Sequence, residues 1–424
     1  MIVNTLPRYE ILSEEEVAVL DAGWRRIVSE LGVAFSSDEA VAAFRGAGQL
    51  VDDERVVKLD PDFLLEQVAK APREFDLQAR NPDRSVHIGG DTMVFSPVYG
   101  SPFVREGPTR REATLDDYRN FARLSQSLPQ LDSVGGTLCE PNDVPLDSRH
   151  LDMVYTLLTE SDKPFMGSVT SGPNAADTIA MAELVFGRES IERTPCVISI
   201  VNVNSPLLYD DRMLAALFEY ARANQPLIVT PFLLMGAMSP VSIPSALAQN
   251  MAEALAGIAL TQLIRPGCPV VLGSFLSNTD MQSGSPSFGT PESAVGLLCT
   301  GQIARHLGLP WRSGGGGLTS SQTVDAQGAY EAVMTMFPAM LAGANYVMHA
   351  AGWLESGLVS SYEKFDVDIE VLRRLEAMFG EEPYQPLQSS WRQVLDEYEE
   401  PPIEPDLRDE LRAYVDRRRR ELGD

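Results

Sequence analysis

The side chains best suited to chemistry are concentrated between Arg312 and Glu363. This segment begins with RSGGGGLTSSQTVDAQGAYE, continues through an apolar helical stretch, and ends with NYVMHAAGWLESGLVSSYE. The stretch holds two short β-branched or aromatic runs, which are typical of strands, and each run ends in a group of Gly, Ser, Asp, His and Glu residues. In parallel α/β proteins the functional groups follow the carboxyl ends of the strands. The sequence therefore predicts an active site at two strand ends.

Two residues of this segment are candidate catalytic groups. His349, one of four histidines, lies at the end of the second strand-like run, and Glu355 follows it. A histidine and a carboxylate at such a place can move a proton or orient a substrate. The alternative interpretation of His349 is a core histidine whose hydrogen bonds are satisfied internally.

Arg312 is the only basic residue within an expected strand. A buried guanidinium requires a carboxylate partner. That partner is either an internal Asp or Glu or the carboxylate of a ligand, and the sequence leaves both open.

The loops that follow the expected strands are rich in Ser, Asn, Gly, Pro, Met and aromatic residues and poor in Lys and Arg. This composition favours an uncharged or cationic ligand over a phosphate, which needs positive donors. Aromatic rings attract a quaternary ammonium by about 0.5–2 kcal/mol each, although aromatic residues also pack at strand ends without binding anything. With Arg312, the candidate substrate-binding residues are Tyr99, Phe232, Phe275, Asn278, Asp280, Trp353 and Tyr362.

Four consecutive glycines, Gly314–Gly317, follow Arg312 without the Gly-Lys-Ser/Thr ending of a P-loop. Three interpretations stay open: a plain turn, a phosphate site after a late barrel strand, and a close approach of backbone to a bulky ligand. Asn278 and Asp280 either position a substrate or close a turn. Asp325 either faces a ligand or favours the start of a helix.

Composition restricts the class of protein. A net charge of −26 over 424 residues argues against a nucleic-acid partner. No run of eighteen apolar residues is present, MIVNTLPRYE lacks the features of a signal peptide, and the four cysteines are widely spaced. We therefore expect a cytoplasmic protein with reduced cysteines and without a structural metal.

Eight short runs of nearly continuous apolar or small residues return at steady intervals, each followed by a polar or Gly/Pro-rich loop and a helical stretch, as in a parallel sheet covered on both faces. The count predicts an α/β fold of the (β/α)8 TIM-barrel type, with a doubly wound sheet as the competitor. We expect an N-terminal helical cap at 1–90, the barrel at 91–380, and a C-terminal Pro-rich connector and helix at 381–424. The runs are Thr92–Pro97, Asp132–Thr137, Pro164–Val169, Cys196–Asn202, Pro226–Phe232, Pro269–Phe275, Leu309–Gly315 and Tyr346–Gly352.

The motifs together resemble a known family. GGLTSSQTVDAQGAYE followed by GANYVMHAAGWLESGLVSSYEKFDVDIE resembles the C-terminal signature of the trimethylamine:corrinoid methyltransferase family. SNTDMQSGSPSFGTPE, LSEEEVAVLDAGWRRIVSELGVAF and KAPREFDLQARNPDRSVHIGG are similar to other segments of that family, so the resemblance covers nearly the whole chain. It implies a barrel that transfers a methyl group from an amine to the cobalt of a corrinoid (cobalamin) on a separate carrier protein.

The sequence departs from the founding trimethylamine enzymes, which carry pyrrolysine, because it contains only standard residues. The corresponding position is expected near Thr319–Asp325. Family members without pyrrolysine imply a quaternary amine such as glycine betaine as the methyl donor. We then expect Arg312 to bind the betaine carboxylate and the aromatic candidates to surround its ammonium, with a corrinoid-facing loop formed by Gly315, Gly316, Ser320, Asp325 and Gln327.

No metal or nucleotide bound by the chain itself is expected, and barrels of this size often form homo-oligomers. Two competing hypotheses remain. One is a lyase or aldolase that binds a phosphorylated substrate with the glycine loop, and the other is a barrel that binds a quaternary amine without catalysis.

Overall fold

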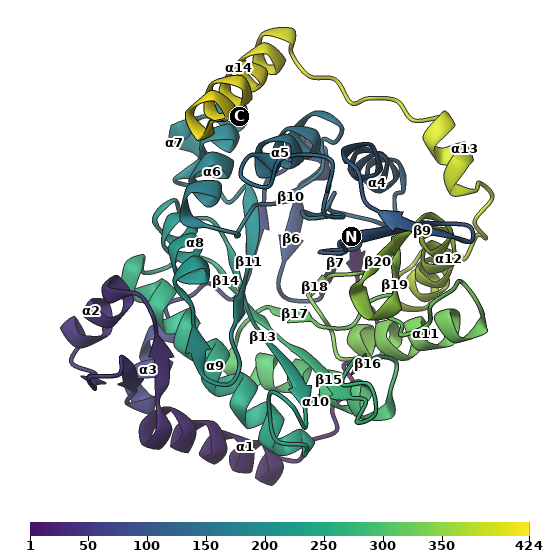
Figure 1. Cartoon of the computed structure of the whole chain (residues 1–424). Coiled ribbons are helices and arrows are strands. Elements are labelled where there is room, and N and C mark those ends of the chain that lie inside the picture. Colours follow the sequence, from purple (N-terminus) through teal and green to yellow (C-terminus); the bar gives the residue numbers. More distant parts are fainter. Residues whose placement is uncertain (424) are drawn as a thin grey trace.

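Parallel strands form the centre of the protein in a computed structural model that describes residues 1–423 (Figure 1). Each strand pairs with the next in parallel. The order in the sheet is β10 (Phe165–Met166), β11 (Val197–Val203), β13 (Leu227–Met235), β14 (Val270–Gly273), β17 (Trp311–Ser313), β18 (Tyr346–Val347) and β7 (Thr92–Phe95).

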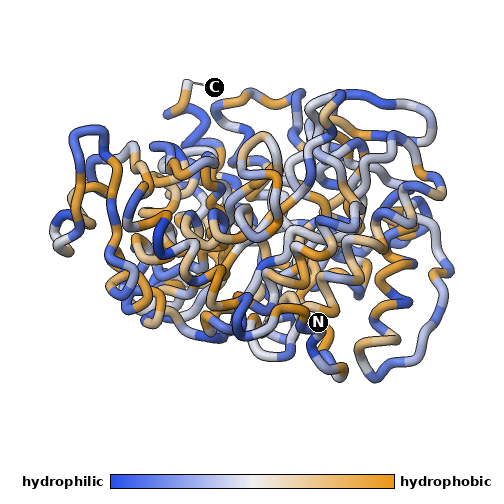
Figure 2. The backbone as a smooth tube through the Cα atoms, turned by 90° about the horizontal axis from the view of Figure 1, so that it is seen from below, coloured by the Kyte–Doolittle hydropathy of each residue, from blue (hydrophilic) through white to orange (hydrophobic). Residues whose placement is uncertain are grey.

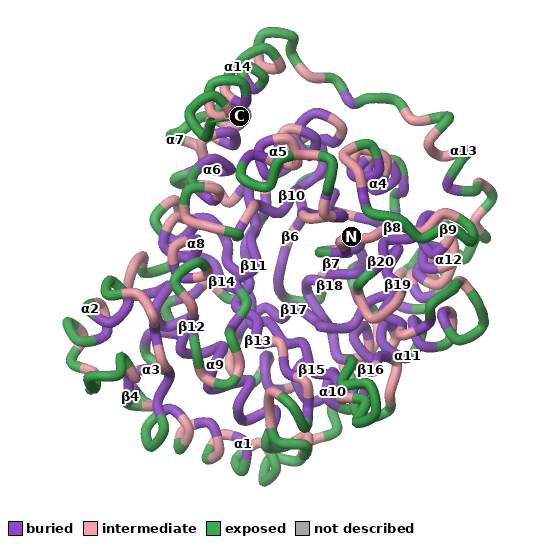
Figure 3. Tube along the Cα trace, in the orientation of Figure 1, coloured by how far each residue is buried: buried purple, intermediate pink, exposed green. Residues whose placement is uncertain are grey.

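These strands confirm seven of the eight expected runs and the mixed α/β class. They are buried along nearly their whole length, which explains why their sequences are continuously apolar rather than alternating. In Figure 3 the central strands are buried, and the exposed residues lie on the outer helices and connections. Hydrophilic stretches mark many of the peripheral loops in Figure 2.

The prediction of a regular strand at Asp132–Thr137 was wrong. In this segment only an isolated parallel bridge joins Gly135 to Phe165. Gly135 has a φ of 87°, which interrupts the extended backbone. The segment still lies between two strands: Asp132 N donates to Phe95 O at 2.9 Å, and Val134 N donates to Pro164 O at 3.0 Å.

Helices surround the strands in Figure 1, as the apolar periodicity between the runs predicts. Their ends follow local signals: Asp210 accepts from Met213 N at the start of one helix, and Gly308 ends another with a φ of 68°. The surrounding helices are α4 (Leu115–Ser127), α5 (Arg149–Thr159), α6 (Gly172–Phe186), α7 (Arg188–Ile191), α8 (Asp211–Arg222), α9 (Ile243–Ile264), α10 (Pro291–Leu307), α11 (Ala326–Leu341) and α12 (Tyr362–Phe379).

The first ninety residues, expected as a helical cap, contain three helices packed against α9: α1 (Glu14–Arg26), α2 (Asp38–Gly46) and α3 (Pro61–Val68). A capping box between Ser13 and Glu16 begins α1. The segment is less purely helical than expected, because it also contributes strands of two or three residues, too short to produce a readable period. These are β1 (Ile2–Val3), β2 (Val33–Phe35), β3 (Leu50–Val51), β4 (Val56–Lys58), β5 (Phe75–Leu77) and β6 (Val86–Ile88); β2–β4 form a sheet with β12 (Leu208–Tyr209).

Further short strands lie beyond the carboxyl ends of the central sheet. One small sheet combines β8 (Phe103–Glu106), β9 (Thr109–Glu112), β19 (Trp353–Leu354) and β20 (Val359–Ser361). The pair β15 (Phe275–Thr279) and β16 (Pro286–Ser287) extends the main sheet from β13.

The C-terminal residues form α13 (Trp391–Asp396) and the predicted charged helix α14 (Pro405–Leu422), joined by a Pro-rich connection along the outside (Figure 1). Helix α14 packs on α5 and α6, where Arg418 Nε lies 2.7 Å from Asp177 Oδ1. None of the helices within residues 1–423 has an apolar stretch that could cross a membrane.

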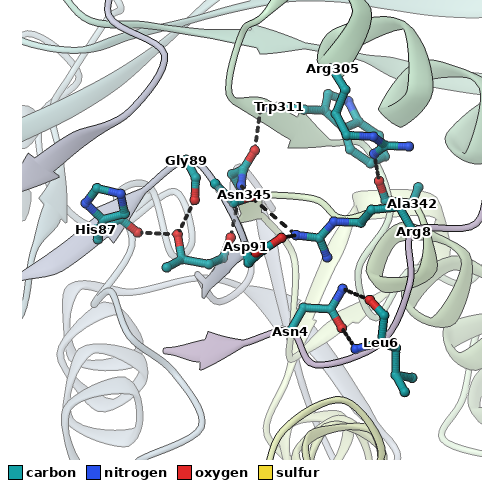
Figure 4. Close-up of polar contacts among 12 residues, drawn as sticks. Asn4, Leu6, Arg8, His87, Gly89, Asp91, Arg305, Trp311, Ala342 and Asn345 are labelled. Carbon is teal, nitrogen blue, oxygen red and sulfur yellow. Dashed lines mark hydrogen bonds and ion pairs between the residues drawn. The ribbon is translucent and has the colours of Figure 1, made fainter.

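The amino ends of three central strands are joined by Asn345 (Figure 4). Its Oδ1 accepts from Trp311 N at 3.1 Å, and its Nδ2 donates to Gly90 O and Thr92 O at 3.1 and 3.0 Å. A single side chain therefore bonds the start of β17 and the start of β7 just before β18 begins. This end of the sheet is closed by structural contacts, which leaves the opposite end for function.

Candidate active site

A cavity of about 150 Å3 lies at the carboxyl ends of the central strands. It contains six of the residues that the sequence singled out: Tyr99, Phe232, Phe275, Arg312, His349 and Trp353. It also contains four that the sequence analysis missed: Ile200, Asn202, Thr230 and Met348. A larger cavity of about 490 Å3 shares Tyr99 with it but holds none of the other predicted site residues.

Arg312 carries an unneutralised charge into the smaller cavity. Its side chain is 1% exposed, Nη1 donates to Ser274 O at 3.2 Å, and Nε has no hydrogen-bond partner in the described part of the chain. Within residues 1–423 no Asp or Glu forms an ion pair with it. Burial lowers the pKa of Arg312 to about 9, so the guanidinium is still charged at neutral pH. The sequence left two possible partners for Arg312, an internal Asp or Glu and the carboxylate of a ligand. The internal partner is not found among the described residues.

His349 is held next to Arg312 as a neutral ring. Arg312 Nη2 lies 3.1 Å from His349 Nε2, and because arginine only donates, Nε2 must accept. Burial, and then the charge of Arg312, lower the pKa of His349 well below its usual value. The proton is therefore on Nδ1, which is buried and has no hydrogen-bond partner among the residues that the structure describes. The imidazole stacks on Trp353, with ring centroids 4.3 Å apart and an interplanar angle of 9°.

Aromatic rings form one wall of the cavity. The Phe275 ring lies 4.8 Å from that of Phe232 and meets Trp353 edge-on, with centroids 6.1 Å apart. Phe288, which was not predicted, supports this wall from behind at 5.3 Å from Trp353. The Arg312 guanidinium lies 5.6 Å from the centroid of Phe275. The wall therefore places aromatic rings beside a separate positive charge.

Four predicted residues do not line this cavity. Asp280 is fully exposed and accepts from Gln282 N, which agrees with the turn interpretation. The other three bond to residues outside the cavity: Asn278 Nδ2 donates to Glu292 Oε2, Glu355 pairs with Arg105 and Arg110, and Tyr362 Oη donates to Asp117 Oδ1.

The glycine loop is buried behind His349 rather than open. A Cβ on Gly316 would lie 2.2 Å from Met348 O and 2.6 Å from His349 O, so only glycine allows the two segments to approach this closely. Gly317 N donates to His349 O at 2.6 Å. Gly315 is buried as well, where a Cβ would lie 2.5 Å from Thr335 O. The loop therefore determines the position of His349.

The remaining predicted loop residues lie in the loop before α11 and in its first turn. Asp325 is exposed and caps the helix by accepting from Gly328 N at 2.9 Å. Gln327 is also exposed and donates to Glu331, and Ser320 Oγ accepts from Phe288 N at 3.0 Å.

Replacing Gly316 with alanine is expected to lower the free energy of unfolding by about 1–3 kcal/mol, because the new methyl group meets main-chain oxygens that cannot rotate away. Urea denaturation of the purified variant measures this loss. Gly46→Ala is the matched control: a Cβ there meets nothing within 4 Å, and alanine suits the helix better than glycine. Equal stability of the two variants would contradict the close contact at Gly316.

Within residues 1–423 no group of three or more His, Cys, Asp or Glu side chains is arranged to hold a metal ion.

Comparison with known proteins identifies relatives along nearly the whole chain. The family model for trimethylamine methyltransferase (MTTB) matches residues 1–387. The chain is 44% identical over 368 residues to a glycine betaine methyltransferase of Desulfitobacterium hafniense (strain Y51), a match that covers 86% of this chain and 76% of that protein. It is 29% identical over 386 residues to a proline betaine:corrinoid methyltransferase of Eubacterium limosum, with 88% and 79% covered.

Among solved structures, the monomethylamine methyltransferase of Methanosarcina barkeri is 12% identical, with a TM-score of 0.44 and with 98% of this chain and 88% of that one covered. The extent of the family match, together with the 44% identity, shows that the chain belongs to the trimethylamine methyltransferase (MTTB) family and is a methyltransferase.

Proposed function

We propose that this enzyme transfers a methyl group from a small betaine, with glycine betaine as the first candidate, to the cobalt(I) of a corrinoid held by a partner protein. The observation that carries the proposal is the buried charge of Arg312, which lies beside an aromatic wall and has no acidic partner within residues 1–423. The names of the two relatives, glycine betaine methyltransferase and proline betaine:corrinoid methyltransferase, support the substrate class and the acceptor. Because the chain belongs to a methyltransferase family, the competing hypothesis of a lyase or aldolase that acts on a phosphorylated substrate is set aside.

The two charged ends of a betaine match the two halves of the cavity. The carboxylate binds the Arg312 guanidinium, whose Nε lacks a partner, and the trimethylammonium group lies against Phe275, Phe232 and Trp353. The size also fits, since an apolar cavity of about 150 Å3 in another protein holds a benzene molecule. Glycine betaine is only slightly larger, whereas longer betaines would crowd the walls.

The chemistry asks little of the protein beyond binding and orientation. When the partner's corrinoid is in place, its cobalt(I) supplies the nucleophile for the methyl carbon. The electron pair of the broken C–N bond stays on nitrogen, so the amine leaves neutral and needs no proton. A neutral His349 agrees with this, because the residue can orient Arg312 and the substrate without supplying an acid. The cavity walls hold one methyl group in line and exclude water.

Trimethylamine is a poorer match for this site. Its nitrogen must keep a proton inside the site for a neutral amine to leave, because the free base would have to expel an amide anion. A quaternary nitrogen needs no such proton. Trimethylamine also has no carboxylate to neutralise Arg312. A substrate that has a quaternary nitrogen and a carboxylate meets both conditions.

The architecture that we propose is a (β/α)8 barrel at 91–380 between an N-terminal segment at 1–90 and a C-terminal segment at 381–424. The hydrogen bonds of residues 132–134 to Phe95 and Pro164 support closure of the sheet by an irregular strand between β7 and β10. Ser320, Asp325 and Gln327 stay candidate contacts for the corrinoid carrier. Gly315 and Gly316 act instead by supporting His349, since both are buried.

The test is to mix the purified enzyme with cobalt(I) cobalamin and one methyl donor at a time, and to follow methylcobalamin by its absorbance. We expect glycine betaine to react at least about ten times faster than choline, which lacks the carboxylate, because truncating one partner of a buried charge pair costs 2–5 kcal/mol. Trimethylamine should not react. No methylcobalamin from any betaine, even with a matched carrier protein, would overturn the proposed function.

A further inference from the structure

A buried ion pair lies on α12 behind the substrate cavity. Lys364 is 0% exposed and Asp368 1%, and Lys364 Nζ donates to Asp368 Oδ1. The pair is also bonded to two loops of the site. Lys364 Nζ donates to Gly317 O at 3.0 Å, and Asp368 Oδ2 accepts from Gly352 N at 2.8 Å.

The two loops that this pair connects support His349 from both sides. Gly317, whose carbonyl binds Lys364, donates its own N–H to His349 O at 2.6 Å. Gly352, bound to Asp368, is three residues after His349 in the same turn. A Cβ on Gly317 would lie 2.7 Å from the Asp368 carboxylate, so carboxylate and loop are in direct contact.

His349 needs such support because its backbone is strained. Its φ is 60°, the left-handed region, which costs a non-glycine residue roughly 1–2 kcal/mol. Strained residues persist only where the surrounding structure holds them. Since His349 Nε2 accepts from Arg312, a shift of this turn would also move the guanidinium.

Stability alone does not explain a charged pair at this place. A well-packed apolar pair of similar volume is often as stabilising as a buried ion pair, which has a large desolvation cost. What an apolar pair cannot do is donate to Gly317 O and accept from Gly352 N at the same time.

We propose that Lys364 and Asp368 are positioning residues of the betaine site, which fix the turn at His349 and through it the guanidinium that binds the substrate carboxylate. The inference rests on the proposed function, because it requires a ligand carboxylate at Arg312. It assigns the pair a role in recognising one end of the substrate, and no role in binding the ammonium.

The experiment compares two ligands on the purified enzyme by isothermal titration calorimetry. Glycine betaine reports on both ends of the site, and tetramethylammonium reports on the aromatic end only. In the double variant Lys364→Met, Asp368→Leu, which leaves no unpaired buried charge, we expect betaine affinity to fall about tenfold or more. Tetramethylammonium affinity should change less than about threefold. Asp368→Asn, which keeps an acceptor for Gly352 N, should lie between the double variant and the unchanged enzyme.

Lys163→Met is the matched control. Lys163 is also buried, at 5% exposed, and donates to three main-chain carbonyls, those of Ser125, Leu128 and Leu131. It differs in position, because it lies just before the amino end of β10. Its loss should affect stability without changing the ratio of the two affinities. Equal losses for both ligands in the double variant, or an unchanged betaine affinity, would overturn the positioning role.

Nitrogen-15 shifts of the His349 ring provide a readout that does not depend on the substrate. We expect a single tautomer with the proton on Nδ1 in the unchanged enzyme, and exchange between tautomers in the double variant, or in Asp368→Asn if the double variant does not fold. An unchanged tautomer in the variant would overturn the positioning role. A different result would overturn the proposed function instead: the tautomers exchange in the variant as expected, but the unchanged enzyme does not bind betaine.

Discussion

Replacing Arg312 with methionine is expected to weaken the binding of glycine betaine about 100-fold or more. The substitution keeps most of the side-chain volume but removes the only positive charge among the described residues that line the cavity. Truncating one partner of a buried, hydrogen-bonded charge pair typically costs 2–5 kcal/mol, which is about 30-fold to several thousandfold in affinity. Isothermal titration calorimetry of the purified variant measures the change directly.

Two controls separate the loss of this contact from general damage. Tetramethylammonium lacks a carboxylate and should bind the Arg312→Met variant as well as before, or better, because a neighbouring positive charge has been removed. Arg305→Met removes another partly buried arginine, which bonds Ala342 O and Glu10 far from the cavity, and should leave betaine affinity unchanged. Betaine binding that is undiminished in Arg312→Met would remove the carboxylate-binding role.

Burial on both faces explains which strands could be predicted from the sequence. Runs such as Cys196–Asn202 and Pro226–Phe232 are buried on both faces, so their apolar character is visible without any pairing information. The run Asp132–Thr137 has only one large apolar residue, Val134, with small and polar residues around it. Its backbone turns at Gly135, and its hydrogen bonds go to main-chain atoms of two neighbouring strands. The extension of Pro269–Phe275 into β15 depends on pairing with β13, which the local sequence does not encode.

The site was predictable to the extent that residue type alone implies a location. An arginine inside a strand and a histidine at a strand end were singled out, and the structure brings Arg312 and His349 within hydrogen-bond distance. Thr230 and Asn202 were missed because a continuously apolar strand does not reveal which face lines a cavity. Glu355 was selected by position in a loop, where the direction of a side chain depends on distant partners such as Arg105.

The pair on α12 shows the limit of pattern reading. Lys364 and Asp368 are four residues apart, the spacing of ordinary ion pairs on exposed helix faces. Nothing local distinguishes a buried pair from an exposed one. Its contacts with Gly317 and Gly352 depend on how two loops, one of them nearly fifty residues earlier in the chain, return to the same helix.

Replacing Trp353 with leucine is expected to weaken glycine betaine binding about 30-fold more than it weakens the binding of 3,3-dimethylbutanoate. The two ligands have the same shape and the same carboxylate, but the second has carbon in place of the quaternary nitrogen. Both lose apolar contact with the indole, whereas only the betaine loses a cation–π attraction, which reaches about 2 kcal/mol in a desolvated site. Trp353 is 6% exposed, so the ring acts in such an environment.

The difference between the ligands, measured by calorimetry on one variant, is insensitive to how far the indole supports the rest of the site. Loss of the indole also removes the stack on His349, which contacts Arg312. This should reduce the affinity for both ligands alike, since both bind Arg312 through a carboxylate. Trp391→Leu is the matched control, because Trp391 is similarly buried but stacks on Tyr362 away from the cavity. Equal losses for the two ligands in Trp353→Leu would mean that the aromatic wall recognises shape and not charge, and the ammonium would then have to be selected elsewhere.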